Sequence, residues 1–176
     1  MSSRRRRTAA VPAGTPRVCS FAPIEHAEAR VLILGSMPGA VSLAAQQYYA
    51  HPHNRFWSIM GALYGADVKL PYRQRIECLR AHGIALWDVF ASCARNGSLD
   101  AAIDQRTAVV NDIPGLLQRC RHIERICCNG TTSYLAFQRH FGAALAGAQA
   151  LQVLRLPSTS PANASWSAAA RFWGSN

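Results

Sequence analysis

Four short runs of apolar, mostly branched residues are spaced along the chain, with longer segments of mixed polarity between them. The runs cover residues Arg30–Leu34, Ile84–Trp87, Ile123–Cys128 and Leu151–Leu156. A short apolar run that stops abruptly at glycine or polar residues is typical of a strand buried inside a parallel sheet. We therefore predict four such strands.

The segments between the runs carry apolar residues at helical spacing. Phe56, Trp57 and Met60 fall on one face of a helix that would begin at Asn54, and asparagine is a common N-cap. We predict helices over residues 54–64, 72–82, 112–120, 131–141 and 163–173, and an irregular loop over residues 89–104.

Alternating strands and helices predict an α/β fold, in which a four-stranded parallel sheet is covered on both faces. Ligands of such sheets bind at the carboxyl ends of the strands. The four ends here are Gly35-Ser-Met-Pro-Gly39, Trp87-Asp88, Asn129-Gly130 and Pro157-Ser-Thr-Ser-Pro161. The topology therefore predicts one concave site, assembled at this edge from residues that are far apart in the sequence. The residues expected around it are Gly35, Met37, Asn54, Phe56, Asp88, Asn129 and Ser158.

One further segment, Tyr48–Trp57, is unusually rich in groups that bind ligands. It holds two tyrosines, two histidines, an asparagine, an arginine and two other large aromatic residues. A structural loop rarely collects so many hydrogen-bonding and stacking groups, so we expect this segment to face the same site.

The length and the net charge of the chain indicate its domain organisation and the kind of partner that it binds. A chain of 176 residues is expected to fold as one domain, here residues 18–176, behind a disordered basic tail at residues 1–17. The formal net charge is +10, and the first seventeen residues contribute five arginines and no acid. This excess points to a polyanion such as DNA. Genome composition is an alternative source of the arginines, since Lys69 is the only lysine.

The arrangement of the cysteines and the hydropathy of the chain indicate the cellular compartment in which we expect the protein. The six cysteines form no CxxC pair and no cluster, so no metal site is predicted; Cys127 and Cys128 are expected to be buried thiols. No apolar run is long enough to span a bilayer, and no apolar segment follows the first arginines as in a secretory signal. We expect a reduced cytoplasmic protein, and nothing in the sequence demands a partner subunit, so a monomer is expected.

The common hydrolase and nucleotide motifs GxSxG, GxxxxGK and GxGxxG are missing. Instead the sequence resembles the uracil-DNA glycosylase superfamily, and within it the hypoxanthine (deoxyinosine) DNA glycosylase branch. The resemblance extends over residues 18–173 and is carried by six motifs. These are Gly35-Ser-Met-Pro-Gly39, His51-Pro-His-Asn-Arg-Phe-Trp57, Gly83-Ile-Ala-Leu-Trp-Asp-Val89, Gly97-Ser-Leu-Asp100, Asn129-Gly130 and Leu156-Pro-Ser-Thr-Ser-Pro161.

The resemblance implies a three-layer α/β/α domain that flips one nucleotide out of DNA and hydrolyses its glycosidic bond, with no cofactor, metal or covalent nucleophile. The expected activity is that of a monofunctional DNA glycosylase acting on deaminated bases, hypoxanthine first. Alternatives are a uracil or mismatch-type glycosylase and a non-catalytic DNA-binding module. Two departures keep the last alternative open. Met37 stands where related branches have a water-positioning aspartate or asparagine, and Leu156 stands where many have a histidine.

The resemblance also suggests roles for individual residues, each with a structural alternative. Asn54 is the best match for the residue that positions the attacking water, or it only caps its helix. Phe56 stacks on the flipped base or packs in the core. Asp88 orients water or accepts the N1–H of hypoxanthine, or it caps backbone amides. Asn129 contacts the base or closes its own turn.

The remaining expectations concern the walls of the site. We expect substrate contacts from the turn and from the aromatic segment, and phosphate contacts from the last loop. The substrate contacts are Gly35, Ser36, Met37, Pro38, Tyr49 and His51, and the phosphate contacts are Ser158, Thr159 and Ser160.

Overall fold

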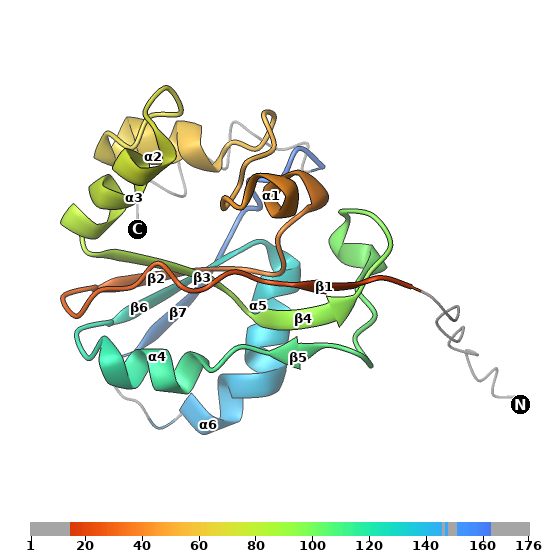
Figure 1. The fold of residues 1–176 in the computed structure, drawn as a ribbon. Coiled ribbons are helices and arrows are strands. Elements are labelled where there is room, and N and C mark those ends of the chain that lie inside the picture. The colour runs from red at the N-terminus through yellow and green to blue at the C-terminus, as the bar shows by residue number, and fades with distance from the viewer. Residues whose placement is uncertain (1–14, 146, 148–150, 163–176) are drawn as a thin grey trace, which may run out of the picture.

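The predicted strands form one parallel sheet in the computed structural model, which describes residues 15–145, 147 and 151–162 (Figure 1). They are β2 (Val31–Gly35), β3 (Ile84–Asp88), β6 (Arg125–Asn129) and β7 (Gln152–Leu156), in the order β3-β2-β6-β7. All three pairings in this sheet are parallel. The prediction of a central four-stranded parallel sheet is confirmed, and every strand bound lies within two residues of the predicted one.

The helices cover both faces of this sheet. Figure 1 shows α1 (Ala40–Ala45), α2 (Phe56–Tyr64) and α3 (Tyr72–Ala81) on one side. On the other side lie α4 (Ile113–Arg119), α5 (Thr131–Phe137) and α6 (Ala143–Leu145). The three-layer α/β/α arrangement expected from the sequence is therefore confirmed.

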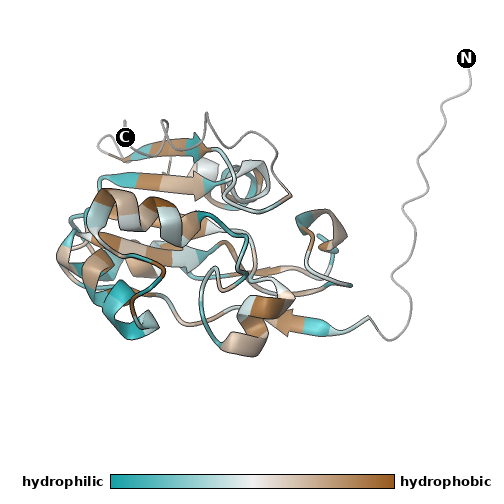
Figure 2. Ribbon diagram, turned by 90° about the horizontal axis from the view of Figure 1, so that it is seen from above, coloured by the Kyte–Doolittle hydropathy of each residue, from teal (hydrophilic) through white to brown (hydrophobic). Residues whose placement is uncertain are grey.

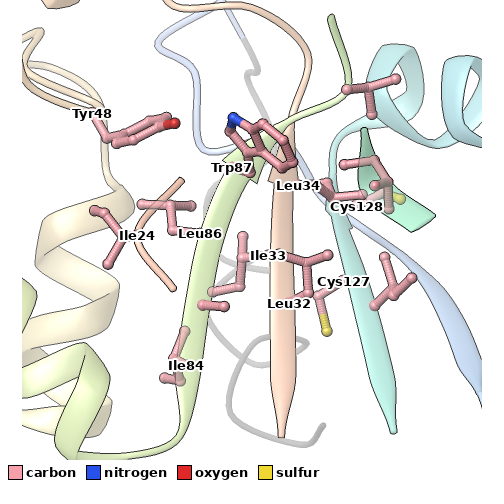
Figure 3. Packing of buried hydrophobic residues seen from close by; sticks show 14 of the residues in the cluster. Ile24, Leu32, Ile33, Leu34, Tyr48, Ile84, Leu86, Trp87, Cys127 and Cys128 are labelled. Atoms are coloured by element: carbon pink, nitrogen blue, oxygen red, sulfur yellow. The ribbon is translucent and has the colours of Figure 1, made fainter. Parts of the chain in front are cut away.

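The core lies between these layers and includes the side chains of the two central strands (Figure 3). Leu32 and Leu34 of β2 are fully buried, which is why the sequence of this strand is apolar throughout. In Figure 2 strands are hydrophobic at their centres and hydrophilic toward their ends. β6 follows this pattern, because it begins with Arg125 and ends with Asn129. The two predicted core thiols are buried as well. Burial raises the pKa of Cys127 to about 11 and of Cys128 to about 12, so both stay protonated.

A second, antiparallel sheet corrects the prediction of a loop over residues 89–104. It consists of β1 (Arg17–Cys19), β4 (Phe90–Ala94) and β5 (Val109–Val110), in the order β1-β4-β5. β4 follows β3 after a single residue, and its Phe90 and Cys93 are fully buried. The small residues between these two hide the strand pattern. Arg17, which was expected to belong to the disordered tail, lies in β1 opposite Ala94.

Several helix bounds also differ from the predictions. The helix expected from residue 54 begins at Phe56, with Arg55 as its N-cap, and α1 was not predicted at all. The helix expected over residues 131–141 is interrupted, because α5 is followed by a π-helical turn at Gln138–Gly142. The helix expected over residues 163–173 and most of the tail lie outside the described residues. Within the described parts of the chain, no helix combines the length and the apolar character needed to cross a membrane.

Candidate active site

A cavity of about 1100 Å³ opens at the carboxyl edge of the parallel sheet. The ends of all four strands contribute to its wall, as the topology predicts. Twelve of the thirteen residues predicted for the site line it: Gly35, Ser36, Met37, Pro38, Tyr49, His51, Asn54, Asp88, Asn129, Ser158, Thr159 and Ser160. Phe56 does not.

Asp88 ends β3 at the buried side of the cavity and is only 3% exposed. Ser20 donates a hydrogen bond from its Oγ to Asp88 Oδ2 at 2.7 Å. Burial raises the pKa of the Asp88 carboxyl to about 7; the Ser20 bond and Arg95 oppose this rise, whereas Asp100 adds to it. A carboxyl group that titrates near neutral pH can exchange a proton with a ligand under physiological conditions.

Gly35 is the neighbour of Asp88 in the sheet, and only glycine fits there. The two residues are directly paired in the register of β2 and β3. A Cβ at position 35 would lie 2.3 Å from Asp88 Oδ1 and 3.0 Å from the Tyr49 hydroxyl. The missing side chain therefore lets a carboxylate and a phenol approach the same point of the cavity.

Tyr49, and not Phe56, presents its ring to the cavity. The two rings stack with centroids 4.0 Å apart and an interplanar angle of 21°. Phe56 is fully buried behind Tyr49, so the structure places it as a core aromatic, the alternative role considered for it. The Tyr49 hydroxyl is buried and makes no hydrogen bond with the described residues. Its pKa is raised by burial and then by Asp88, with the Asn129 amide acting in the opposite direction, so Tyr49 remains a neutral donor.

Asn54 lines the cavity just before α2. Its Oδ1 accepts a hydrogen bond from the Phe56 amide at 3.0 Å, so the side chain does stabilise the start of the helix, although Arg55 is the N-cap residue. A carbonyl oxygen has a second lone pair, and the Asn54 Nδ2 group makes no hydrogen bond with any described residue. The helix contact therefore leaves most of the amide available to a ligand.

The turn after β2 is held in place by residues that follow β4. Ser36 donates from Oγ to Asp100 Oδ1 at 2.6 Å, and Ala40 donates its amide to Ser98 Oγ at 2.9 Å. The guanidinium of Arg95, 1% exposed, donates to the Pro38 carbonyl. Met37, at the centre of the turn, is 6% exposed and offers no polar group.

The side chain of Asn129 is hydrogen-bonded to the loop after β7 and not to its own turn. Its Oδ1 accepts from the Thr159 amide and its Nδ2 donates to Thr159 Oγ1, both at 2.9 Å. Thr159 is 2% exposed, so the structure does not present its hydroxyl to phosphate as expected. Ser158 and Ser160 are half-buried on the same loop. Gly130 has φ +103°, and a Cβ there would lie 3.0 Å from the Ser158 Cβ, which explains the glycine.

His51 lines the cavity but is engaged locally, because its Nδ1 accepts from the His53 amide at 3.2 Å. Among the residues that the structure describes, no three His, Cys, Asp or Glu side chains gather closely enough to hold a metal ion.

Four residues that shape the site were not predicted from the sequence. One is Arg95, which donates to the Pro38 carbonyl in the turn after β2. Asp100 and Ser98 belong to a motif quoted for the family resemblance, but no role was assigned to them. Ser20 comes right after β1 and reaches Asp88 only through the antiparallel sheet, so no local signal marks it.

Three comparisons relate this geometry to known proteins. Residues 23–174 match the family model of the uracil DNA glycosylase superfamily. A protein named hypoxanthine DNA glycosylase from Methanosarcina barkeri is 36% identical over 114 residues, which are 64% of this chain and 71% of that protein. One of the same name from Methanosarcina acetivorans is 35% identical over 62% of this chain and 69% of its own length.

The fold has a solved counterpart as well. The solution NMR structure of a candidate uracil DNA glycosylase from Methanosarcina acetivorans superposes with a TM-score of 0.75 at 30% identity, covering 91% of this chain and 96% of that one. The match of the family model over nearly the whole chain, together with a cavity at the predicted edge, shows that the chain belongs to the uracil DNA glycosylase superfamily and is a DNA glycosylase.

Proposed function

We propose that this DNA glycosylase removes deaminated bases from DNA, hypoxanthine first, by hydrolysis with a bound water. Two relatives that carry the name hypoxanthine DNA glycosylase support this substrate. The chemistry of the cavity supports it too. Hypoxanthine has an N1–H donor beside a carbonyl acceptor, and the cavity offers a carboxyl at Asp88, a phenol at Tyr49 and an amide at Asn54.

The single observation that carries the proposal is that Asn54 and Asp88 face one cavity while Met37 occupies the centre of the turn. Hydrolysis forms a bond from the water oxygen to C1′ of the sugar and breaks the bond from C1′ to N9. The electron pair of that bond leaves with the base, and the water releases a proton. We assign the positioning of the water to Asn54, through its free Nδ2 and the second lone pair of Oδ1.

We assign to Asp88 a second polar contact with the reacting groups, either the attacking water or the base. In its ionised form it accepts either the proton of the attacking water or a hydrogen bond from the N1–H of the base. In the first role its negative charge offsets the positive charge that develops on the sugar, and the proton that it takes up can then neutralise the departing base. In the second role the hydrogen bond holds the base in place. One face of the Tyr49 ring packs on Phe56, which holds the ring in place, and the other face provides a stacking surface for the flipped base.

The test compares excision and binding by Asn54 variants on a duplex with a single deoxyinosine. Asn54→Ala should lower single-turnover excision by roughly a hundredfold or more, as expected for a lost preorganised polar group. Its equilibrium binding to the same duplex should change little. The helix contact disappears as well, at a cost of about 1 kcal/mol in the free energy of unfolding.

Asn54→Asp is the matched control, because its carboxylate can still accept the Phe56 amide hydrogen bond. It should unfold like the wild type, which separates the loss of chemistry from the loss of the helix contact. If Asn54→Ala folds and excises hypoxanthine at close to the wild-type rate, the assignment of Asn54 is wrong and Asp88 becomes the residue to test.

A second substrate, uracil, is favoured by the structural neighbour, which is a candidate uracil DNA glycosylase. Uracil has an N3–H between carbonyls, so a pocket that binds one lactam edge can accept the other. Parallel assays on duplexes with deoxyinosine or deoxyuridine decide the ranking. Excision of uracil alone would overturn the proposal of hypoxanthine as first substrate.

A further inference from the structure

The phosphates on either side of a flipped nucleotide come close to the cavity that receives its base, so groups on the cavity wall can bind them. Thr159 was expected to do so, but it is 2% exposed and occupied: its amide donates to Asn129 and its hydroxyl accepts from Asn129. The loop after β7 therefore offers phosphate fewer accessible donors than its sequence suggests. The strand that precedes this loop adds a group of a different kind.

Arg155, the next-to-last residue of β7, lines the cavity and is exposed to solvent. It is the only arginine or lysine among the residues of the cavity wall that the structure describes. Its guanidinium forms no hydrogen bond or ion pair with any other described residue. A guanidinium has five N–H donors and a permanent positive charge, so this group is available to an anionic ligand.

The charge of Arg155 is important because the other charges on the described wall repel DNA. Asp88 and Asp100 are the two carboxyl groups there, and Asp100 accepts a hydrogen bond from Ser36 Oγ at 2.6 Å. A carboxylate and a phosphate repel each other over several ångströms, less so where salt screens them. A guanidinium at the same cavity offsets this repulsion at the point where the strand has to approach.

Hydroxyl groups line the same corner of the cavity. Gly130 donates its amide to the Leu156 carbonyl at 3.0 Å, so the segments that follow β6 and β7 leave the sheet side by side. Thr131 on the first segment and Ser160 on the second both line the cavity. Ser160 Oγ accepts a backbone amide at 3.4 Å, which leaves its hydroxyl proton available to a phosphate oxygen. The corner that contains Arg155 thus combines a cation with hydroxyl donors.

We propose that Arg155 binds a phosphate of the damaged strand beside the flipped nucleotide, with Thr131 and Ser160 as further donors. This inference rests on the proposed base excision and adds the residue that anchors the strand to β7. Two N–H groups of the guanidinium can reach two oxygens of one phosphate. Such a contact carries no information about the base; it fixes where the sugar of the flipped nucleotide lies relative to the cavity.

The test measures the DNA affinity of Arg155→Gln and Arg139→Gln. Arg139 is the matched control: it is exposed in the π-helical turn after α5, has no hydrogen bond or ion pair with any described residue, and does not line the cavity. The probe is a duplex with a single tetrahydrofuran residue, an abasic analogue that offers no base to remove. Both side chains are exposed, so both variants should keep the wild-type melting temperature.

Loss of one phosphate contact predicts two changes. At about 0.1 M salt, Arg155→Gln should bind the tetrahydrofuran duplex roughly five- to tenfold more weakly than the wild type. The slope of the logarithm of the affinity against the logarithm of the salt concentration should become shallower by about 0.9. Arg139→Gln should stay within about twofold of the wild type, with an unchanged slope.

An undamaged duplex of the same sequence shows whether the contact is local to the lesion. Its strand does not enter the cavity, so Arg155→Gln should bind it within about twofold of the wild type. Neutral methylphosphonates then identify the phosphate. At the phosphate that Arg155 binds, this substitution should weaken wild-type binding roughly five- to tenfold but change the binding of Arg155→Gln less than about twofold, because the ion pair is already lost.

Three results would overturn the proposal. Arg155→Gln could bind the tetrahydrofuran duplex like Arg139→Gln, it could lose as much affinity for the undamaged duplex, or its loss could multiply with that of a methylphosphonate at every phosphate flanking the lesion. The tetrahydrofuran residue has no base, so these results do not depend on which base the protein removes. A wild type that excises uracil and not hypoxanthine would contradict the proposed substrate alone.

Discussion

The raised pKa of Asp88 predicts that this residue makes the protein less stable as the pH increases. The carboxyl is 3% exposed, and burial raises its pKa from the ordinary 3.8 to about 7. Between these two pH values the folded protein retains a proton that the unfolded chain has released. Stability conferred by the protonated form is therefore complete below about pH 4 and is lost as the pH rises to about 7.

The magnitude follows from the same two values. Each tenfold change in an ionisation constant corresponds to about 1.36 kcal/mol, so a rise of the pKa from 3.8 to about 7 amounts to about 4 kcal/mol at most. Asp88→Asn replaces the carboxyl by a group of the same shape that does not ionise, and its Oδ1 can still accept the Ser20 hydroxyl. At pH 8 this variant should be more stable than the wild type by up to about 4 kcal/mol, and at pH 4 the two should agree within about 1 kcal/mol.

Urea denaturation of both proteins at intervals from pH 4 to pH 8 measures this effect. Taking the difference in unfolding free energy at each pH removes the contribution of all groups that the substitution leaves alone. A difference that stays constant across the range would refute the argument, because Asp88 would then titrate alike in the folded and unfolded chain. A difference of opposite sign would mean that the folded protein stabilises the ionised carboxylate.

Two further predictions concern the neighbours of Asp88. Ser20→Ala removes the hydrogen bond that holds the carboxyl pKa down, so the midpoint of the pH profile of excision should move to higher pH, and an unchanged midpoint would contradict this. Gly35→Ala would place a Cβ 2.3 Å from Asp88 Oδ1 and should cost about 1 to 3 kcal/mol of stability together with most of the excision activity. Gly39→Ala is its control, because a Cβ there would lie 3.6 Å from its nearest neighbour, an ordinary contact; equal losses in both variants would contradict the role of Gly35.

The position of the site could be predicted from the sequence because it depends on local signals. Four apolar runs end in glycine or polar residues, and parallel topology brings such ends to one edge. Twelve predicted residues consequently line one cavity. Phe56 was harder to place, since its spacing fits both a buried helix face and a stacking platform. Only the packing of Tyr49 over it decides between the two.

The contacts that tune the site could not be predicted, because they depend on pairing between segments distant in sequence. Ser20 and Asp88 are separated by 68 residues, and Pro38 and Arg95 by 57. The first contact exists because β1 pairs with β4, and the second because β4 brings Arg95 to the turn after β2; the small residues of β4 give no clear periodicity. A short strand with this composition is indistinguishable from a loop until its partner is known.

The two sheets contribute differently to the chemistry of Asp88. The parallel sheet brings Asp88 to the cavity, where burial alone would keep its carboxyl protonated to still higher pH. The antiparallel sheet supplies Ser20 and Arg95, and both lower the pKa of that carboxyl back toward neutrality. An acceptor of protons must be partly ionised at the working pH, and a pKa of about 7 satisfies this requirement where a fully buried acid without these partners would not. The small sheet therefore adjusts the protonation of a site whose location the large sheet determines.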